Sequence, residues 1–146
     1  MSELHLPIRP DSTALLVVDL QEKLMPVIDG REAVIENTRK LLPLAAILSM
    51  PVLATRQYAK GLGATVTGIA ELLDHEPIDK VCFGCMGDAV FRQRLSAVLP
   101  PGGAVLLCGV EAHICVMQTA LGMREQGYTV ILPAPPPARD LGPTRN

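Results

Sequence analysis

The sequence carries little excess charge of either sign: thirteen Lys and Arg oppose fifteen Asp and Glu, a net charge of −2 with neutral histidines. The basic residues are scattered singly, so we expect neither nucleic acid nor an anionic membrane surface as a partner. No apolar run approaches the roughly 18–20 residues needed to span a bilayer. The N-terminus, MSELHLP, also lacks the basic start and apolar stretch of a signal peptide, and we therefore expect a cytoplasmic protein.

Cysteine is also scarce, with four residues at Cys82, Cys85, Cys108 and Cys115. A chain of 146 residues that is 49% hydrophobic is long enough to bury its own core as one domain, so it needs no disulfides. Cys82 and Cys85 have the C-x-x-C spacing of a redox pair or of half a zinc site, but no second pair follows. We expect no metal and no cofactor, and interpret this pair as thiols packed under the segment around Lys80. A thiol redox role for the pair is the alternative.

The order of the apolar segments predicts an α/β fold with a parallel sheet. Five short runs have the composition of buried strands and alternate with helical patterns; they cover residues 14–18, 51–55, 78–82, 104–108 and 129–132. The main helices are expected at about 29–48, 88–99 and 115–126. The segment 61–68 is rich in Gly and Thr but lacks the Gly-Lys-Ser/Thr of a phosphate loop, so we expect it to be a loop over the site.

Several residues are expected to shape these helices. Asp29 and Glu32 have the spacing of a capping box, and Gly127 has the position of a glycine that ends a helix. Pro43 removes a backbone donor and clashes one turn back, at a cost of about 3 kcal/mol, so we expect a kink or a new helix start there. In the second long helix we expect four residues to face inward: Val90, Phe91, Leu95 and Val98.

Three residues with useful chemistry fall where strands end. Asp19 follows the first strand, Lys80 lies within the short third strand, and Cys115 lies at the start of the helix that follows the fourth. In an open parallel sheet the carboxyl ends of the strands line the ligand crevice. A helix N-terminus and a neighbouring lysine both favour the thiolate, the form that attacks a carbonyl carbon, and Asp19 can take the thiol proton.

Taken alone, each of these residues has a plainer interpretation. Asp19 is then the cap of a turn, Lys80 a solvated charge and Cys115 a small buried side chain. Their joint spacing favours an activated nucleophile instead.

Three segments carry a family resemblance: VVDLQ at 17–21, KVCF at 80–83 and GVEAHICV at 109–116. Together with QYAKGLG at 57–63 they resemble the motifs of the isochorismatase-like cysteine hydrolases, most of all the branch whose substrates are mostly unassigned. The resemblance runs from about residue 14 to 132. It implies a doubly wound, Rossmann-like sheet of order 3-2-1-4-5, with a sixth strand in complete members. It also implies that Asp19, Lys80 and Cys115 are catalytic, cleaving a small amide or related C–N bond through a thioester.

The resemblance implies further site residues. Backbone N–H groups at Cys115 and near Glu111 would form the oxyanion hole, beside a cis bond between Val110 and Glu111. Other residues expected to contact the substrate are Ala112, His113, Gln21 and Tyr58.

The chain departs from some members of the family. Metal-binding members have Asp-x-His after the second strand, where this chain has TRQY at 55–58, so no metal is implied. Isochorismatase proper lacks the cysteine, so hydrolysis of a vinyl ether is not expected.

The resemblance fails after Leu132. We expect a hydrolase domain over residues 1–132, incomplete at its C-terminal end, and a proline-rich, extended tail over 133–146. Loss of the last helix and strand would leave apolar surface uncovered, which predicts a homo-oligomer. The alternative function is therefore a truncated, weakly active or inactive homologue that serves as an oligomer subunit.

Overall fold

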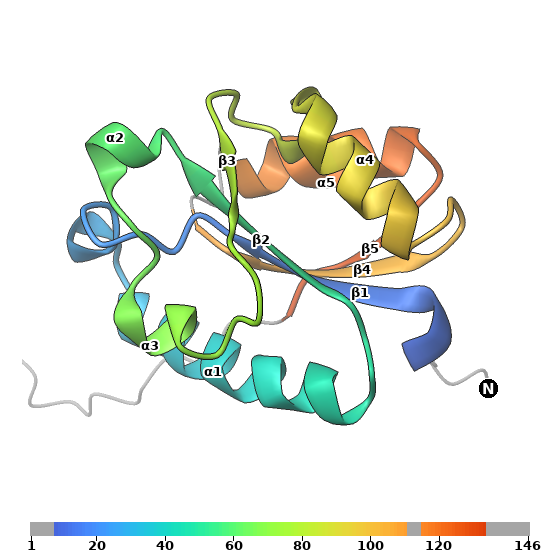
Figure 1. Ribbon diagram of the computed structural model, residues 1–146, viewed down its shortest axis with the longest axis horizontal. Helices are drawn as coiled ribbons and strands as arrows, with labels where there is room; N and C mark the ends of the chain where they lie inside the picture. The colour runs from blue at the N-terminus through green and yellow to red at the C-terminus, as the bar shows by residue number, and fades with distance from the viewer. Residues whose placement is uncertain (1–7, 111–114, 134–146) are drawn as a thin grey trace, which may run out of the picture.

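A single parallel sheet organises the chain, and the computed structural model describes residues 8–110 and 115–133 of it (Figure 1). The five strands lie in the order β3-β2-β1-β4-β5, as predicted. Their bounds are β1 (Thr13–Val18), β2 (Val52–Gln57), β3 (Ile78–Lys80), β4 (Ala104–Gly109) and β5 (Thr129–Ile131). The described residues contain no sixth strand, and residues 134–146, most of the predicted tail, lie outside them.

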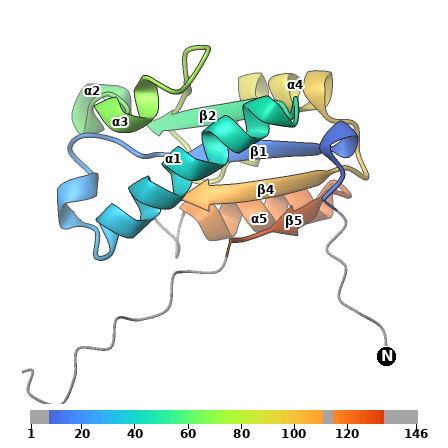
Figure 2. The same cartoon turned by 90° about the horizontal axis from the view of Figure 1, so that it is seen from below.

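Helices cover both faces of the sheet, as expected for a doubly wound fold (Figures 1 and 2). One face carries α1 (Arg31–Ile47) and the short α3 (Thr67–Ala70), while the other carries α4 (Ala89–Val98) and α5 (Met117–Glu125). A further short helix, α2 (Ala59–Leu62), follows β2. Single 3-10 turns lie at Pro10–Ser12, Met25–Val27 and Cys85–Gly87.

The central position of β1 in the sheet explains why its residues 14–18 are all apolar. Ala14, Leu16 and Val18 belong to the core under α4 and α5, whereas Leu15 and Val17 belong to the core under α1. All six residues of β1 are buried, because helices cover both of its faces. β1 therefore ends deep inside the molecule, between β2 and β4.

Two details of α1 differ from the prediction. The predicted capping box is wrong: Gly30, at φ +73°, is the N-cap residue, and no side chain caps the helix. The left-handed turn at Gly30 makes the chain enter the helix one residue later than Asp29 would require. Of the kink or new start expected at Pro43, the new start does not occur, because α1 continues through Pro43; the kink stays a prediction. Leu42 and Ala45 are buried beside it, and this tertiary packing holds the helix together despite the lost hydrogen bond.

In α4 the inward face is also partly different. Phe91 and Leu95 are buried as predicted, but Val90 and Val98 are exposed and Leu99 is buried instead. Phe91 and Leu95 are four residues apart and so share one face of α4. Leu99 is the C-cap residue in extended conformation, and it is buried just beyond the end of the helix. At the end of α5, Gly127 follows the C-cap residue and has φ +91°, as predicted.

Val18 of β1 pairs with Gly109 of β4 where both strands end, and the two backbones leave no room there for a side chain on Gly109. Gly109 has φ +138°, and a Cβ atom there would lie 2.2 Å from the Val18 carbonyl oxygen. Only glycine fits this position. The close approach brings the end of β4, and the segment that leads to Cys115, next to the end of β1.

Candidate active site

Asp19 leaves β1 in an unusual conformation. Its φ is +57°, in the left-handed region, and its side chain is 0% exposed. Asp19 Oδ1 accepts a hydrogen bond from Thr55 Oγ1 at 2.8 Å, and Oδ2 accepts one from Lys80 Nζ at 3.0 Å. Aspartate tolerates the left-handed region better than most residues, but such conformations still concentrate at functional sites. The turn directs the carboxylate towards β2 and β3.

Lys80 is wholly buried, with a side chain that is 0% exposed, so its interpretation as a solvated charge is wrong. Its ammonium group reaches the Asp19 carboxylate and the Gln57 side-chain oxygen, the latter at 2.7 Å. It also donates to the backbone carbonyls of Cys82 and Phe83, at 3.2 and 3.0 Å. A buried cation is tolerated only when it is paired and hydrogen-bonded in this way.

Cys115 completes the group. It is buried and lies with Val116 in π-helical conformation directly before α5. Its Sγ is 3.9 Å from Lys80 Nζ, within reach of a hydrogen bond to sulfur. The structure thus brings together Asp19, Lys80 and Cys115, which the sequence places up to 96 residues apart (19 to 115). The group lies at the carboxyl ends of the strands.

Two members of the network were missed from the sequence, Thr55 and Gln57. Both are buried and lie two positions apart on β2, so their side chains share one face of the strand. Thr55 pairs with Val18, the residue before Asp19, and Gln57 pairs with Lys80. The available signal was a Thr-x-Gln spacing at the end of an otherwise apolar strand.

The Gln21 side chain hydrogen-bonds to the backbone of Gln57, at the end of β2, and so supports the network around Lys80. Its Nε2 donates to the carbonyls of Gln57 and Gly63 at 3.0 and 2.9 Å, and its Oε1 accepts from the Gln57 N–H at 2.7 Å. Gln21 is completely buried. It therefore fixes the end of β2 relative to the segment after β1. Its predicted contact with a substrate stays a prediction.

Tyr58 is exposed and, like Asp19, has a positive φ, +41°. Its backbone N–H donates to the Lys80 carbonyl at 2.9 Å, and its predicted role at the pocket likewise stays a prediction. The predicted contacts Glu111, Ala112 and His113, and the bond before Glu111, lie outside the described residues.

The other thiols have a different character. Burial raises the pKa of Cys85 to about 11, although Thr119 and Lys80 act in the opposite direction. Burial likewise raises the pKa of Cys108 to about 11, opposed by Thr38. Cys82 and Cys85 form no disulfide. In the part of the chain that the structure describes, no three His, Cys, Asp or Glu residues gather to hold a metal ion.

The fold and this cluster define the class. The chain belongs to the isochorismatase family, whose domain matches residues 13–134. It is 37% identical over 125 residues to the secreted isochorismatase effector Isc1 of Phytophthora sojae, covering 83% of this chain and 59% of that protein. The chain thus spans little more than half the length of that relative. The described residues include no helix that is long and apolar enough to cross a membrane.

Solved structures show the same likeness. A MAR1 ribonuclease from Caenorhabditis elegans superposes with a TM-score of 0.76 at 39% identity, covering 86% of this chain and 64% of that one. More distantly, the YcaC product of Escherichia coli, an octameric hydrolase of unknown specificity, superposes with a TM-score of 0.79 at 21% identity, covering 90% and 66%. The second likeness concerns the fold alone.

Proposed function

We propose that this chain is a cysteine-dependent hydrolase that cleaves a small amide or related C–N bond through a thioester on Cys115. One observation carries the proposal: the buried Lys80 ammonium lies between the Asp19 carboxylate, at 3.0 Å, and the Cys115 Sγ, at 3.9 Å. A fixed cation beside a thiol stabilises the thiolate. A carboxylate in the same network supplies a proton acceptor.

In this mechanism Asp19 accepts the proton of the Cys115 thiol as Sγ attacks the substrate carbonyl carbon. The C–N bond then breaks, and the amine leaves with the proton that Asp19 held. Water attacks the resulting thioester, again giving its proton to Asp19. The acid product departs, and the thiol recovers its proton. Backbone N–H groups at Cys115 and near Glu111 are proposed to hold the oxyanion.

Other features support parts of this proposal. Asp19, Lys80 and Cys115 belong to one hydrogen-bonded network, which favours an active enzyme over an inactive subunit. The net charge of −2 does not favour RNA as a substrate, although the C. elegans relative bears the name ribonuclease. We place the chain in the cytoplasm, where the thiols of Cys82 and Cys85 would stay reduced. The P. sojae relative is named as secreted, so the placement needs a test. Cell fractionation provides it: the protein should be found in the cytoplasmic fraction, and its presence in the culture medium would contradict the placement.

We further propose a homo-oligomer. β3 is an edge strand of three residues, and the apolar side chains of Val81 and Phe83 just after it are exposed. Exposed apolar side chains beside an open sheet edge favour association. Light scattering tests this: a monomer at all accessible concentrations would contradict it.

The function is tested by incubating the chain with a library of small amides, carbamates and ureides, followed by mass spectrometry of the intact protein and its peptides. We expect product formation and an acyl adduct on the peptide that contains Cys115. Cys115→Ser should abolish both, whereas the matched Cys108→Ser should retain both. Turnover that survives Cys115→Ser would refute the thioester mechanism. Cleavage of an RNA oligonucleotide, measured in parallel, would favour the ribonuclease, and a Cys82–Cys85 disulfide would favour a redox protein.

A further inference from the structure

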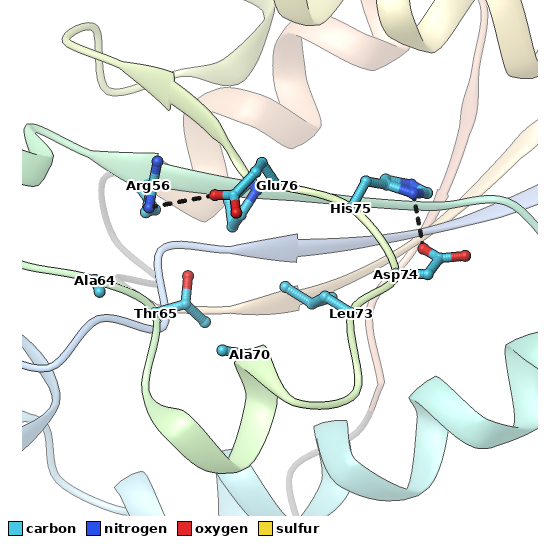
Figure 3. A pocket seen from close by; sticks show the side chains of 9 residues that line it. Arg56, Ala64, Thr65, Ala70, Leu73, Asp74, His75 and Glu76 are labelled. Carbon is cyan, nitrogen blue, oxygen red and sulfur yellow. Dashed lines mark ion pairs between the residues drawn. The ribbon is translucent and has the colours of Figure 1, made fainter.

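A cavity of about 570 Å³ beside β2 and α3 is separate from the three proposed catalytic residues, none of which lines it (Figure 3). The charged side chains on its wall lie beside one another: Arg56 is 4.0 Å from Glu76, and the His75 ring is 2.8 Å from Asp74. The packing that bears on Cys115 lies on the face of the sheet that carries α4 and α5. There the 3-10 turn after β3 contacts α5, the helix that follows Cys115.

α5 turns a polar residue inwards and apolar residues outwards. Its buried residues are Thr119 and Met123, whereas Met117 and Leu121 are exposed. A buried hydroxyl group costs free energy unless it is hydrogen-bonded, and an apolar side chain is the more usual occupant of such a position. The inward threonine therefore indicates that this position serves a hydrogen bond.

The hydrogen bond of Thr119 joins α5 to the segment that holds Lys80. Thr119 Oγ1 accepts from the Cys85 backbone N–H at 2.9 Å, and the bond is buried. Directly before Cys85 and Gly84, the carbonyls of residues 82 and 83 accept from Lys80 Nζ at 3.2 and 3.0 Å. One hydrogen bond thus connects the helix that follows the candidate nucleophile with the backbone that fixes the cation.

Two glycines bring the same segments into direct contact on either side of this bond. A Cβ atom on Gly84 would lie 3.1 Å from the Gln118 Cβ atom, and a Cβ atom on Gly122 would lie 2.9 Å from the Met86 Cβ atom. Residues 84, 85 and 86 therefore all pack against α5. Interiors packed this closely transmit displacements, so a shift of the segment or of the helix moves the other.

The three proposed catalytic residues are held in different ways. Asp19 directly follows β1 and Lys80 ends β3, and β2 lies between these two strands in the sheet. Cys115 belongs to no strand and lies just before α5. The distance of 3.9 Å between Lys80 Nζ and Cys115 Sγ therefore depends on how α5 packs.

We propose that Thr119 is a positioning residue for the Cys115 thiol: its hydrogen bond to the Cys85 N–H fixes α5 against the segment that holds Lys80, and so sets the distance between ammonium and sulfur. This inference rests on the proposed function, in which Cys115 is the nucleophile. Coulomb attraction falls with distance. At an effective dielectric constant of about 20, a separation longer by about 1 Å would lower the thiolate population roughly threefold to tenfold.

The test is the rate at which iodoacetamide alkylates Cys115 in the full chain, measured over a range of pH by peptide mass spectrometry. Thr119→Val removes the hydroxyl at nearly constant volume. It should slow alkylation of Cys115 at pH 7 about threefold to tenfold and raise the midpoint of the pH profile by about half to one unit. Thr119→Ser keeps the hydroxyl and should restore the wild-type midpoint. An unchanged midpoint in Thr119→Val, or equal shifts in the two variants, would overturn the proposal.

Two internal controls separate positioning from a general loss of stability. Cys108 belongs to the core on the other face of the sheet, so its alkylation reports opening of the whole fold and should not change. Tyr128→Phe removes another buried hydrogen bond, from the Tyr128 hydroxyl to the Leu99 carbonyl at 2.9 Å, beyond the far end of α5. It should leave the profile of Cys115 unchanged. A shift as large as that of Thr119→Val would overturn the positioning role.

A second variant keeps every hydrogen-bonding group, in case the unpaired Cys85 N–H prevents Thr119→Val from folding. Gly122→Ala favours the helix itself but brings a Cβ atom to within 2.9 Å of Met86, so the turn and α5 must separate slightly. It should shift the Cys115 profile in the same direction as Thr119→Val, and an unchanged profile would count against the proposal.

The wild-type chain distinguishes this inference from the function on which it rests. If wild-type Cys115 reacted no faster than Cys108, the proposed nucleophile and the positioning role would both fail. If wild-type Cys115 reacted faster and neither Thr119→Val nor Gly122→Ala moved its midpoint, the positioning role alone would fail.

Discussion

The burial of Lys80 predicts that its loss damages stability as well as chemistry. Lys80→Met keeps much of the side-chain volume but removes the ammonium. The side chains of Thr55 and Lys80 both donate to the Asp19 carboxylate, which is 0% exposed. In Lys80→Met only the hydrogen bond from Thr55 would remain. The acceptors of Gln57, Cys82 and Phe83 also lose a donor. Breaking a buried ion pair by removing one partner costs about 3–5 kcal/mol, which is a large part of the roughly 5–15 kcal/mol that stabilises a domain.

The measurement is urea unfolding followed by circular dichroism at pH 7. We expect Lys80→Met to lower the free energy of unfolding by about 3–5 kcal/mol. The double variant Asp19→Asn/Lys80→Met should recover part of that loss, because it no longer buries an unpaired carboxylate. Lys40→Met is the matched control: its side chain is 71% exposed and pairs with Glu36 on the surface of α1, so its effect should stay within about 0.5 kcal/mol. If Lys80→Met behaved like the control, or the double variant were no more stable than the single one, the argument from burial would be refuted.

The remaining predictions concern reactivity and backbone geometry. At pH 7 iodoacetamide should alkylate Cys115 faster than Cys85 or Cys108, whose pKa of about 11 leaves only about one thiol in 10⁴ as thiolate; equal rates by peptide mass spectrometry would argue against a nucleophile at Cys115. Hydrolase activity should resist EDTA, and its loss with recovery on adding zinc or manganese would contradict the mechanism. Gly109→Ala should destabilise the fold far more than Gly102→Ala. The added Cβ atom at position 109 would lie 2.2 Å from a carbonyl oxygen, whereas a Cβ atom at position 102 would have no neighbouring atom within 4 Å. Thermal unfolding measures the difference, and similar melting temperatures would show that β1 and β4 separate easily.

The sequence was most informative about which residues form the candidate active site. Asp19 follows an apolar run and Lys80 lies in a predicted strand, and the rule that strand ends meet at one edge of a parallel sheet predicts that they come together. The strand order came from the family resemblance. Thr55 and Gln57 could not be assigned in the same way, because their role depends on the register between β2 and its neighbours. A shift of one residue would turn both side chains to the opposite face.

Local signals failed where packing or backbone geometry decided the outcome. Asp29 and Glu32 have the right spacing for a capping box, yet the turn at Gly30 sets the start of α1. Pro43 has a strong local preference against a helix interior, and burial of the neighbouring residues outweighs it. Such choices depend on contacts between segments that are distant in the sequence, which a local pattern does not contain.

The surroundings of Lys80 have a consequence for how the site responds to charge. An ammonium group has three protons, whereas five acceptors lie within reach of Nζ: the side chains of Asp19, Gln57 and Cys115 and the carbonyls of Cys82 and Phe83. At every moment at least two of these acceptors are without a lysine proton. Rotation about the Cε–Nζ bond redistributes the protons while every heavy atom stays in place. A negative charge that forms on the Cys115 sulfur can thus be met by turning an N–H bond, without movement of the chain or entry of water.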